Sequence, residues 1–229
     1  MIASGGRSTL LAAVSVPYLI RRSDRARRIR VSVDNDGQVV VVLPRRSPER
    51  HAEDAVRQLG PWIERRRRAV AKAVSEMERA PGTVSYLGET LRLVPQAGRE
   101  RVLRRGDALL VPEGDPRAAL ERWYRRQAKL EIAPRLDAAT ARYGTSYTGL
   151  TIRSQRTRWA SRSTSGGMSF NWRLLLAPPE ILDYVVEHEV AHIEVMDHSP
   201  RFWRLLASRS PGWRQHSAWL RRYGSTLTL

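Results

Sequence analysis

The chain has 229 residues, no cysteine and a formal net charge of +17. Without cysteine it can form neither a disulfide nor a zinc site with thiolate ligands, and this composition fits a reducing cytoplasm, where we expect the protein to be. The length suits one large or two small domains, and a hydrophobic fraction of 41% is enough to build a core.

Nearly all of the basic residues are arginine, since Lys72 and Lys129 are the only lysines. Basic residues outnumber acidic ones in both halves of the chain, which argues against a disordered basic tail. The excess fits a protein that meets phosphates, whether of nucleotides or of nucleic acid. A solvated basic surface explains the charge equally well, so charge alone does not decide between the two interpretations.

The N-terminal segment carries no sign of a membrane span. The apolar run from Leu10 to Ile20 is too short to cross a bilayer, and Pro17 interrupts it. The arginine-rich flank follows this run, which is the wrong side for a secretory signal. We expect residues 1–12 to be a flexible leader and the protein to have no membrane partner.

Residues 13–113 are expected to form a mixed N-terminal α/β domain. Alternating apolar residues predict strands near 14–22, 29–33 and 39–43, with a turn at 34–37, and hence a small antiparallel sheet. Pro48 and Pro61 each suit the first turn of a helix. Two further hairpins are predicted over residues 84–94 and 101–111.

The proline- and glycine-rich stretch 112–116 is the predicted boundary to a second domain, residues 114–229. A long helix follows Pro116; Pro134 should kink or break it, and Gly144 should end it. Residues 148–153 then read as a strand.

A basic segment comes next, Gln155 to Ser163, with the sequence QRTRWASRS. If it is extended, Trp159 shares one face with Thr157 and Ser161, while the other face carries Arg156, Arg158 and Arg162. A turn at 165–167 and a returning strand through Trp172 complete a basic hairpin. Its guanidinium groups are candidates to bind anionic substrate oxygens. The alternative is that the segment is an exposed, solvated strand. Considered alone, the segment favours this alternative.

The stretch from Glu180 to Trp203 carries the strongest chemical signal. His188, Glu189 and His192 form an H-E-x-x-H pattern, which on a helix projects both imidazoles from one face. Pro178 and Pro179 suit the start of that helix, and its apolar residues predict that it is buried. Two imidazoles so placed can hold a zinc ion, with Glu189 as general base.

A catalytic zinc usually has three protein ligands, and His198 is the strongest candidate for the third. Its spacing equals that of the metzincin pattern, although Val195 stands where that pattern has glycine. No Asp or Glu occurs after residue 200, so His216 is the only competitor downstream. An H-E-x-x-H pattern can arise by accident, but three of the five histidines of this chain fall within eleven residues.

Two further helices are predicted, one opening at Ser199-Pro200 and one after residues 210–212. Their aromatic residues are expected to pack around the metal helix rather than to stack on a ligand.

With these segments in view, the chain resembles the YgjP-like metal-dependent hydrolases, a family with a zincin-type metallopeptidase fold that includes a UTP pyrophosphatase branch. The resemblance spans about residues 14–224. It is carried by RWxS (158–161), NWRL (171–174), YVVxHExAH (184–192) and HSPxFW (198–203). It implies zinc bound by His188, His192 and His198, Glu189 as catalytic acid and base, and the strand of Arg158 and Trp159 beside the cleft. The usual Trp-Gly-Ser-Cys of the family is here Trp159-Ala160-Ser161-Arg162, which puts substrate preference in question.

The predicted fold class is α+β, with an N-terminal mixed sheet and helix domain followed by a zincin-like helical domain whose basic hairpin lies next to the metal helix.

The first functional hypothesis is a zinc hydrolase. Arg156, Arg158, Trp159 and Arg162 would bind its substrate, a nucleoside triphosphate or a peptide. The alternative hypothesis is a basic, nucleic-acid-associated protein, loosely like SprT-like proteins, with a structural or vestigial metal site. The sequence predicts no oligomeric state.

Overall fold

The computed structural model describes residues 16–34, 37–155 and 158–229, and the chain divides into two compact units, Met1–Glu78 and Arg79–Leu229. Each unit has its own apolar cluster. Over the described ranges, every helix is too short or too polar to cross a membrane. The predicted leader, residues 1–12, lies outside the described residues.

The first unit contains a three-stranded sheet made of β1 (Tyr18–Ser23), β2 (Arg30–Val33) and β3 (Val39–Pro44). The strand order is β1-β3-β2; β2 pairs with β3 in the antiparallel sense, whereas β1 pairs with β3 in parallel. The expected all-antiparallel sheet is therefore wrong. The most apolar strand, β3, takes the central place because both of its edges are then paired and its valines are covered.

Helices α1 (Arg50–Gln58) and α2 (Gly60–Glu76) complete the first unit. Pro61 lies in the first turn of α2, as the sequence predicts. Ala52 and Val56 of α1 and Ile63 of α2 pack in one buried cluster with the inward-facing residues of β3.

The second unit begins with a four-stranded sheet: β4 (Thr83–Tyr86), β5 (Glu89–Gln96), β6 (Leu103–Arg105) and β7 (Ala108–Pro112). Both predicted hairpins are confirmed, and a parallel pairing of β5 with β7 joins them in the order β4-β5-β7-β6. Leu87 and Gly88, both with positive φ, form the tight turn between β4 and β5.

The observed division of the chain differs from the predicted boundary at 113/114. Leu91 and Leu109 of the four-stranded sheet lie in the same buried cluster as Leu120 and Trp123 of the following helix. The sheet therefore belongs to the second unit, because its apolar face is buried against that helix.

Helix α3 (Arg117–Arg142) is 26 residues long and contains Pro134. The predicted break at Pro134 does not occur. Pro134 is exposed, and Leu130, whose carbonyl loses its usual i+4 donor, is 63% exposed, so the lost hydrogen bond falls on the solvent side of the helix. Gly144, with φ of +61°, follows the helix end as predicted.

A third sheet lies against the helices of the second unit: β8 (Gly149–Arg153), β9 (Ala160–Arg162) and β10 (Gly167–Asn171), in the order β8-β10-β9. The predicted hairpin of β9 with β10 is confirmed. The returning strand ends at Asn171, and Trp172 begins a 3-10 turn, η1 (Trp172–Leu176), which the sequence did not predict. The Asn171 side chain accepts a hydrogen bond from the Arg173 backbone N–H and so starts that turn.

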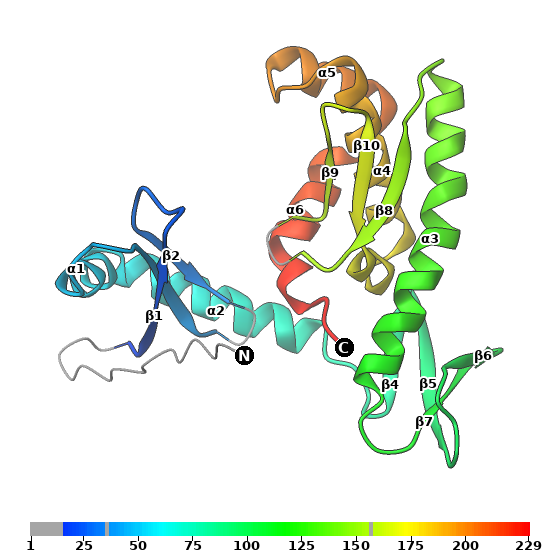
Figure 1. Ribbon diagram of the computed structural model, residues 1–229, viewed down its shortest axis with the longest axis horizontal. Helices are drawn as coiled ribbons and strands as arrows, with labels where there is room; N and C mark the ends of the chain where they lie inside the picture. Colours follow the sequence, from blue (N-terminus) through cyan, green and yellow to red (C-terminus); the bar gives the residue numbers. More distant parts are fainter. Residues whose placement is uncertain (1–15, 35–36, 156–157) are drawn as a thin grey trace. The chain divides into compact units, whose positions relative to one another are not determined.

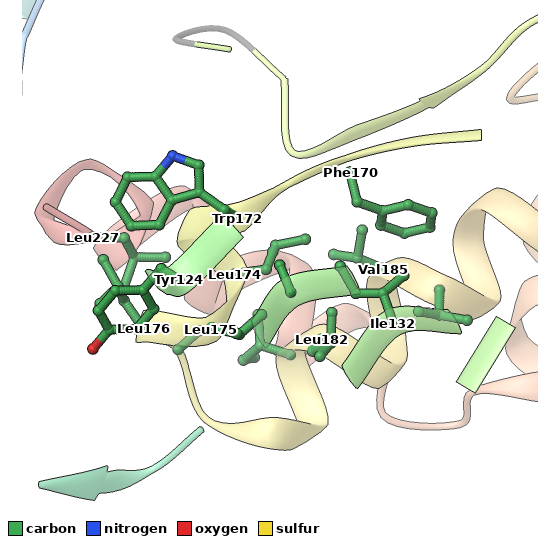
Figure 2. Close-up of a cluster of buried hydrophobic side chains, with 14 of the residues drawn as sticks. Tyr124, Ile132, Phe170, Trp172, Leu174, Leu175, Leu176, Leu182, Val185 and Leu227 are labelled. Atoms are coloured by element: carbon green, nitrogen blue, oxygen red, sulfur yellow. The ribbon is translucent and has the colours of Figure 1, made fainter. Parts of the chain in front are cut away.

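The last elements are α4 (Pro179–Glu194), α5 (Pro200–Arg209), α6 (Trp213–Tyr223) and the short turn η2 (Gly224–Thr226). Figure 1 shows α4 behind the β8–β10–β9 sheet, with α3 running alongside β8. The core drawn in Figure 2 lies between α3, the sheet and α4. Ile132 of α3, Phe170 of β10 and Leu182 and Val185 of α4 converge there. This packing holds the H-E-x-x-H helix against the sheet.

Candidate metal centre

Helix α4 carries the H-E-x-x-H residues, and its start and burial follow from its sequence. Pro178 is extended and Pro179 is the first helical residue. The N–H that Pro179 lacks would have had no intrahelical acceptor in the first turn, so its absence costs the helix no hydrogen bond. Val190 and Ala191 are fully buried. At the other end, Val195 turns to extended backbone with φ of −134°, which releases the chain toward His198.

Three histidines converge at the C-terminal end of α4. The Nε2 atom of His188 lies 3.2 Å from that of His192 and 3.1 Å from that of His198, and all three candidate ligand atoms lie within 4.8 Å of one another. Two nitrogens that share one tetrahedral zinc at about 2.0–2.1 Å stand about 3.3 Å apart. The spacing of these nitrogens fits one small divalent cation.

The tautomer of His192 is fixed by a backbone contact. Its Nδ1 lies 3.0 Å from the carbonyl oxygen of Val195. Because that oxygen can only accept, Nδ1 must carry the proton and donate it, which leaves Nε2 with a free lone pair. The lone pair is aimed at the other two imidazoles, as a metal ligand requires.

Burial favours the neutral form of two of the three imidazoles, those of His188 and His192. Burial, together with the neighbouring His192 and His198, lowers the pKa of His188 to about 3, and burial lowers the pKa of His192 as well. Neutral imidazole is the form that binds a metal. Three imidazole nitrogens that face one another, with no carboxylate of the described residues among them, fit a bound cation. Zinc is the usual metal for such a donor set.

The loop between α4 and α5 returns His198 to the site. Asp197 Oδ1 accepts the backbone N–H of Ser199 at 3.1 Å, which closes a tight turn around His198. The His198 ring then stacks on Trp203 at 5.4 Å between centroids. His216, the competing candidate, lies on α6 beside Tyr184 and does not belong to the cluster of three.

Aromatic side chains of α5 support the ligands. Phe202 is fully buried and stacks on the His192 ring at 4.4 Å, while Trp203 carries His198 on one face and stacks on Trp213 at 4.6 Å on the other. The sequence predicted that these aromatics pack around the metal helix. It did not predict their stacking on ligand rings, because His198 lies in the turn before α5, outside the helical spacing.

Glu189 is 6% exposed and lies under the edge of β9. Burial raises the pKa of its carboxyl to about 7, while Arg158 and a hydrogen bond from the backbone of Arg162 act in the opposite direction. A carboxyl whose pKa lies near neutrality can both accept and return a proton.

The basic segment supplies two arginines to the same region. Arg162, at the end of β9, donates from Nη1 to the Met196 sulfur at 3.0 Å, and its charge acts on His192. The Nε of Arg162 is buried without a hydrogen-bond partner among the described residues. Arg158 is exposed and acts on Glu189 through its charge.

The other two residues of the predicted substrate-binding set are placed differently. Trp159 is half-buried in the core cluster, and its indole lies so close to Gly224 that a Cβ there would stand 2.7 Å away. Trp159 thus packs β9 onto the C-terminal turn η2. Arg156 lies outside the described residues.

Comparison with known proteins identifies the family. The model of the YgjP-like metallopeptidase domain matches residues 27–223, so the chain belongs to the YgjP-like family and carries a metallopeptidase-type domain of the metal-dependent hydrolases. No curated protein matches the chain significantly.

Two solved structures are similar to part of the chain. The metallopeptidase zymogen of Pyrococcus abyssi abylysin is 25% identical, with a TM-score of 0.36, and the match covers 42% of this chain and 94% of abylysin. The zymogen of Methanocaldococcus jannaschii jannalysin is 16% identical, with a TM-score of 0.34 and coverage of 38% and 90%. At such low TM-scores the assignment rests on the family model alone.

Proposed function

We propose that this protein is a zinc-dependent hydrolase that cleaves a phosphoanhydride bond of a nucleoside triphosphate. In this proposal His188, His192 and His198 hold the metal, and Glu189 is the general acid and base. When bound, zinc would polarise the scissile phosphoryl group and make the attacking water more acidic. The observation that supports an anionic substrate is Arg162, a half-buried cation beside the histidines with an unused donor.

The residues of the chain account for the proton and charge movements of such a reaction. The Glu189 carboxylate takes a proton from the water whose oxygen attacks the α-phosphorus. The bond from that phosphorus to the bridging oxygen breaks, and Glu189 returns the proton to the released pyrophosphate. Arg162 and Arg158 would pair with the phosphate oxygens, whose negative charge their guanidinium groups match.

Peptide hydrolysis is the second candidate function, and the position of β9 favours it. Among the described strands, β9 pairs only with β10, so its other edge has no strand partner. That edge lies beside α4 and could receive an extended peptide. The N–H of Arg162 on that edge is already directed to Glu189, and the strand has only three residues. Both facts weaken the edge as a peptide template, which is why we place the nucleotide first.

Paired assays separate the two candidates. Pyrophosphate release from the common nucleoside triphosphates, UTP included, is measured beside digestion of a peptide library, with zinc content recorded for each protein. We expect turnover of a nucleotide, and a fall in kcat of about 10²- to 10⁴-fold in Glu189→Gln with zinc retained. Peptide cleavage without nucleotide turnover would favour the second candidate. Full turnover by Glu189→Gln would remove the proposed base.

The role of Arg162 has a test of its own. Arg162→Gln should raise the KM for the nucleotide about 10- to 100-fold, because a charge-assisted contact contributes about 1.5–3 kcal/mol. Arg105→Gln, which removes the same charge at an exposed position of β6, is the matched control and should change KM little. An unchanged KM in Arg162→Gln would contradict substrate binding by this side chain.

A further inference from the structure

One end of the sheet in the first unit gathers eight arginines. Because β2 runs antiparallel to β3 while β1 runs parallel to it, the connection from β1 to β2, residues 24–29, crosses the C-terminal end of the central strand. Arginines on β1, on this connection, at the start of β2 and just after β3 therefore meet there. We call this region the arginine end; it comprises Arg21, Arg22, Arg25, Arg27, Arg28, Arg30, Arg45 and Arg46.

The strand register places two of these arginines on the face of the sheet that points away from the core. Arg21 of β1 and Arg30 of β2 both stand opposite Val42 of β3, whereas Val41 and Leu43 on either side of Val42 face the buried cluster. Both arginines are exposed, yet Val42 between them is only 4% exposed. Their Cα atoms are two strand spacings, about 10 Å, apart. The two arginines therefore stand on either side of a buried valine on this face of the sheet.

The positive charge at this end is poorly balanced. Two carboxylates are paired there, Asp24 with Arg45 at 3.0 Å and Glu49 with Arg22 at 3.2 Å. The other six arginines are all exposed, and among the described residues none of their side chains has an ion-pair or hydrogen-bond partner. Like charges so close repel one another, and a polyanion would relieve that repulsion.

The kind of side chain points to phosphate rather than to a lipid surface. Guanidinium groups match phosphate oxygens in a two-pronged geometry. A peripheral membrane site adds several exposed apolar side chains to its charges. Here the connection has none, since Ala26 and Ile29 are half-buried, and Leu19, 38% exposed, is the single large apolar residue on the outer strand face of β1. This end also presents no exposed aromatic ring among the described residues, so bases would not stack on it.

We propose that the arginine end binds the phosphate backbone of nucleic acid without sequence preference. This is a second binding surface, in a different unit of the chain from the histidines, and it does not depend on the hydrolytic function. Sequence-independent binding of this type comes from phosphate contacts and falls steeply with salt.

The test measures binding of the 229-residue chain to fluorescent 25-nucleotide single strands and duplexes of arbitrary sequence by anisotropy, from 0.05 to 0.2 M salt. The variant Arg25→Gln/Arg27→Gln/Arg28→Gln removes three charges from the connection. We expect it to bind at least about 10-fold more weakly at 0.1 M salt and to lower the slope of log K against log salt by about two to three. The corresponding triple lysine variant should keep the slope.

A matched control separates this surface from net charge. Arg122→Gln/Arg126→Gln/Lys129→Gln removes the same charge from exposed positions of α3 and should change the affinity less than about threefold. Equal weakening in both triple variants would overturn the proposal, as would the absence of wild-type binding at 0.1 M salt. Binding to phosphatidylserine vesicles without binding to either oligonucleotide would assign the surface to lipid instead. Unchanged melting temperatures confirm that each variant is folded.

Discussion

Burial shifts the pKa values of the adjacent residues His188 and Glu189 in opposite directions, so their contributions to stability depend on pH in opposite ways. His188 has a pKa of about 3 in the folded protein against 6.5 as a free side chain, so the unfolded chain takes up a proton first as the pH falls. Its contribution to stability is complete above pH 6.5 and is lost toward pH 3. Glu189, with a pKa of about 7 against 4.5, behaves in the reverse way: its contribution is complete below pH 4.5 and is lost as the pH rises through 7.

The metal-free Glu189→Gln variant should therefore be more stable than the wild type at alkaline pH. We expect the free energy of unfolding to rise by about 3 kcal/mol at pH 8, the equivalent of the pKa shift, and the gain to shrink toward pH 5. Urea unfolding of both proteins with a chelator at the two pH values measures this. Glu180→Gln, an exposed position of the same helix, is the control and should show no such pH dependence. An equal gain at both pH values would contradict the assigned cause.

Gly224 lies against the Trp159 indole. A Cβ at this position would meet the Trp159 indole at 2.7 Å, so Gly224→Ala must displace the indole and with it the start of β9. We expect a loss of about 1–3 kcal/mol of stability, a change in tryptophan fluorescence and reduced turnover with zinc still bound. Gly149→Ala, where no atom lies within 4 Å of the new Cβ, should leave fluorescence and turnover as they are. Wild-type fluorescence in Gly224→Ala would show that the contact does not hold Trp159.

Helix α3 tolerates a proline in its interior. Pro134 removes one intrahelical hydrogen bond at an exposed position, and the rest of the helix is held by its buried face. Pro134→Ala restores the N–H without disturbing the core, so we expect the free energy of unfolding to rise by about 1–3 kcal/mol. Urea unfolding monitored by circular dichroism measures it. A loss of stability would mean that the proline ring makes contacts the alanine cannot replace.

Elements also differ in how far the sequence predicted them. Helix α4 was predictable in bounds and burial because Pro179 and an uninterrupted apolar run are local signals. The partner of β1 was not, because parallel pairing with β3 brings together residues about twenty positions apart and leaves no turn signature. The 3-10 turn η1 was missed because its Trp172 continues the alternation of β10.

The two buried clusters found among the described residues have no residue in common, so metal removal should affect them unequally. A ligand that binds only the folded state stabilises it by about 4 kcal/mol at 1,000 times its dissociation constant. We expect chelation to increase amide exchange in α4 and α5 and to leave the amides of β3 unchanged. Hydrogen exchange followed by mass spectrometry, with and without chelator, measures this. Equal deprotection of both units would indicate that they unfold as one.

The sequence alone predicted the residues of the candidate site: the H-E-x-x-H helix, His198 as the favoured third histidine and a basic strand just before them in the chain. It could do so because helical spacing and the proline start are local properties of the chain. Whether His198 or His216 lies with the pair could be seen only in the folded chain, because it depends on the turn closed by Asp197 and on the stacking of His198 on Trp203. The tertiary structure also decided the unit to which the four-stranded sheet belongs, and it separated Arg162, which lies at the histidines, from Trp159, which packs on Gly224. These choices depend on contacts between residues far apart in the chain, and no local pattern encodes them.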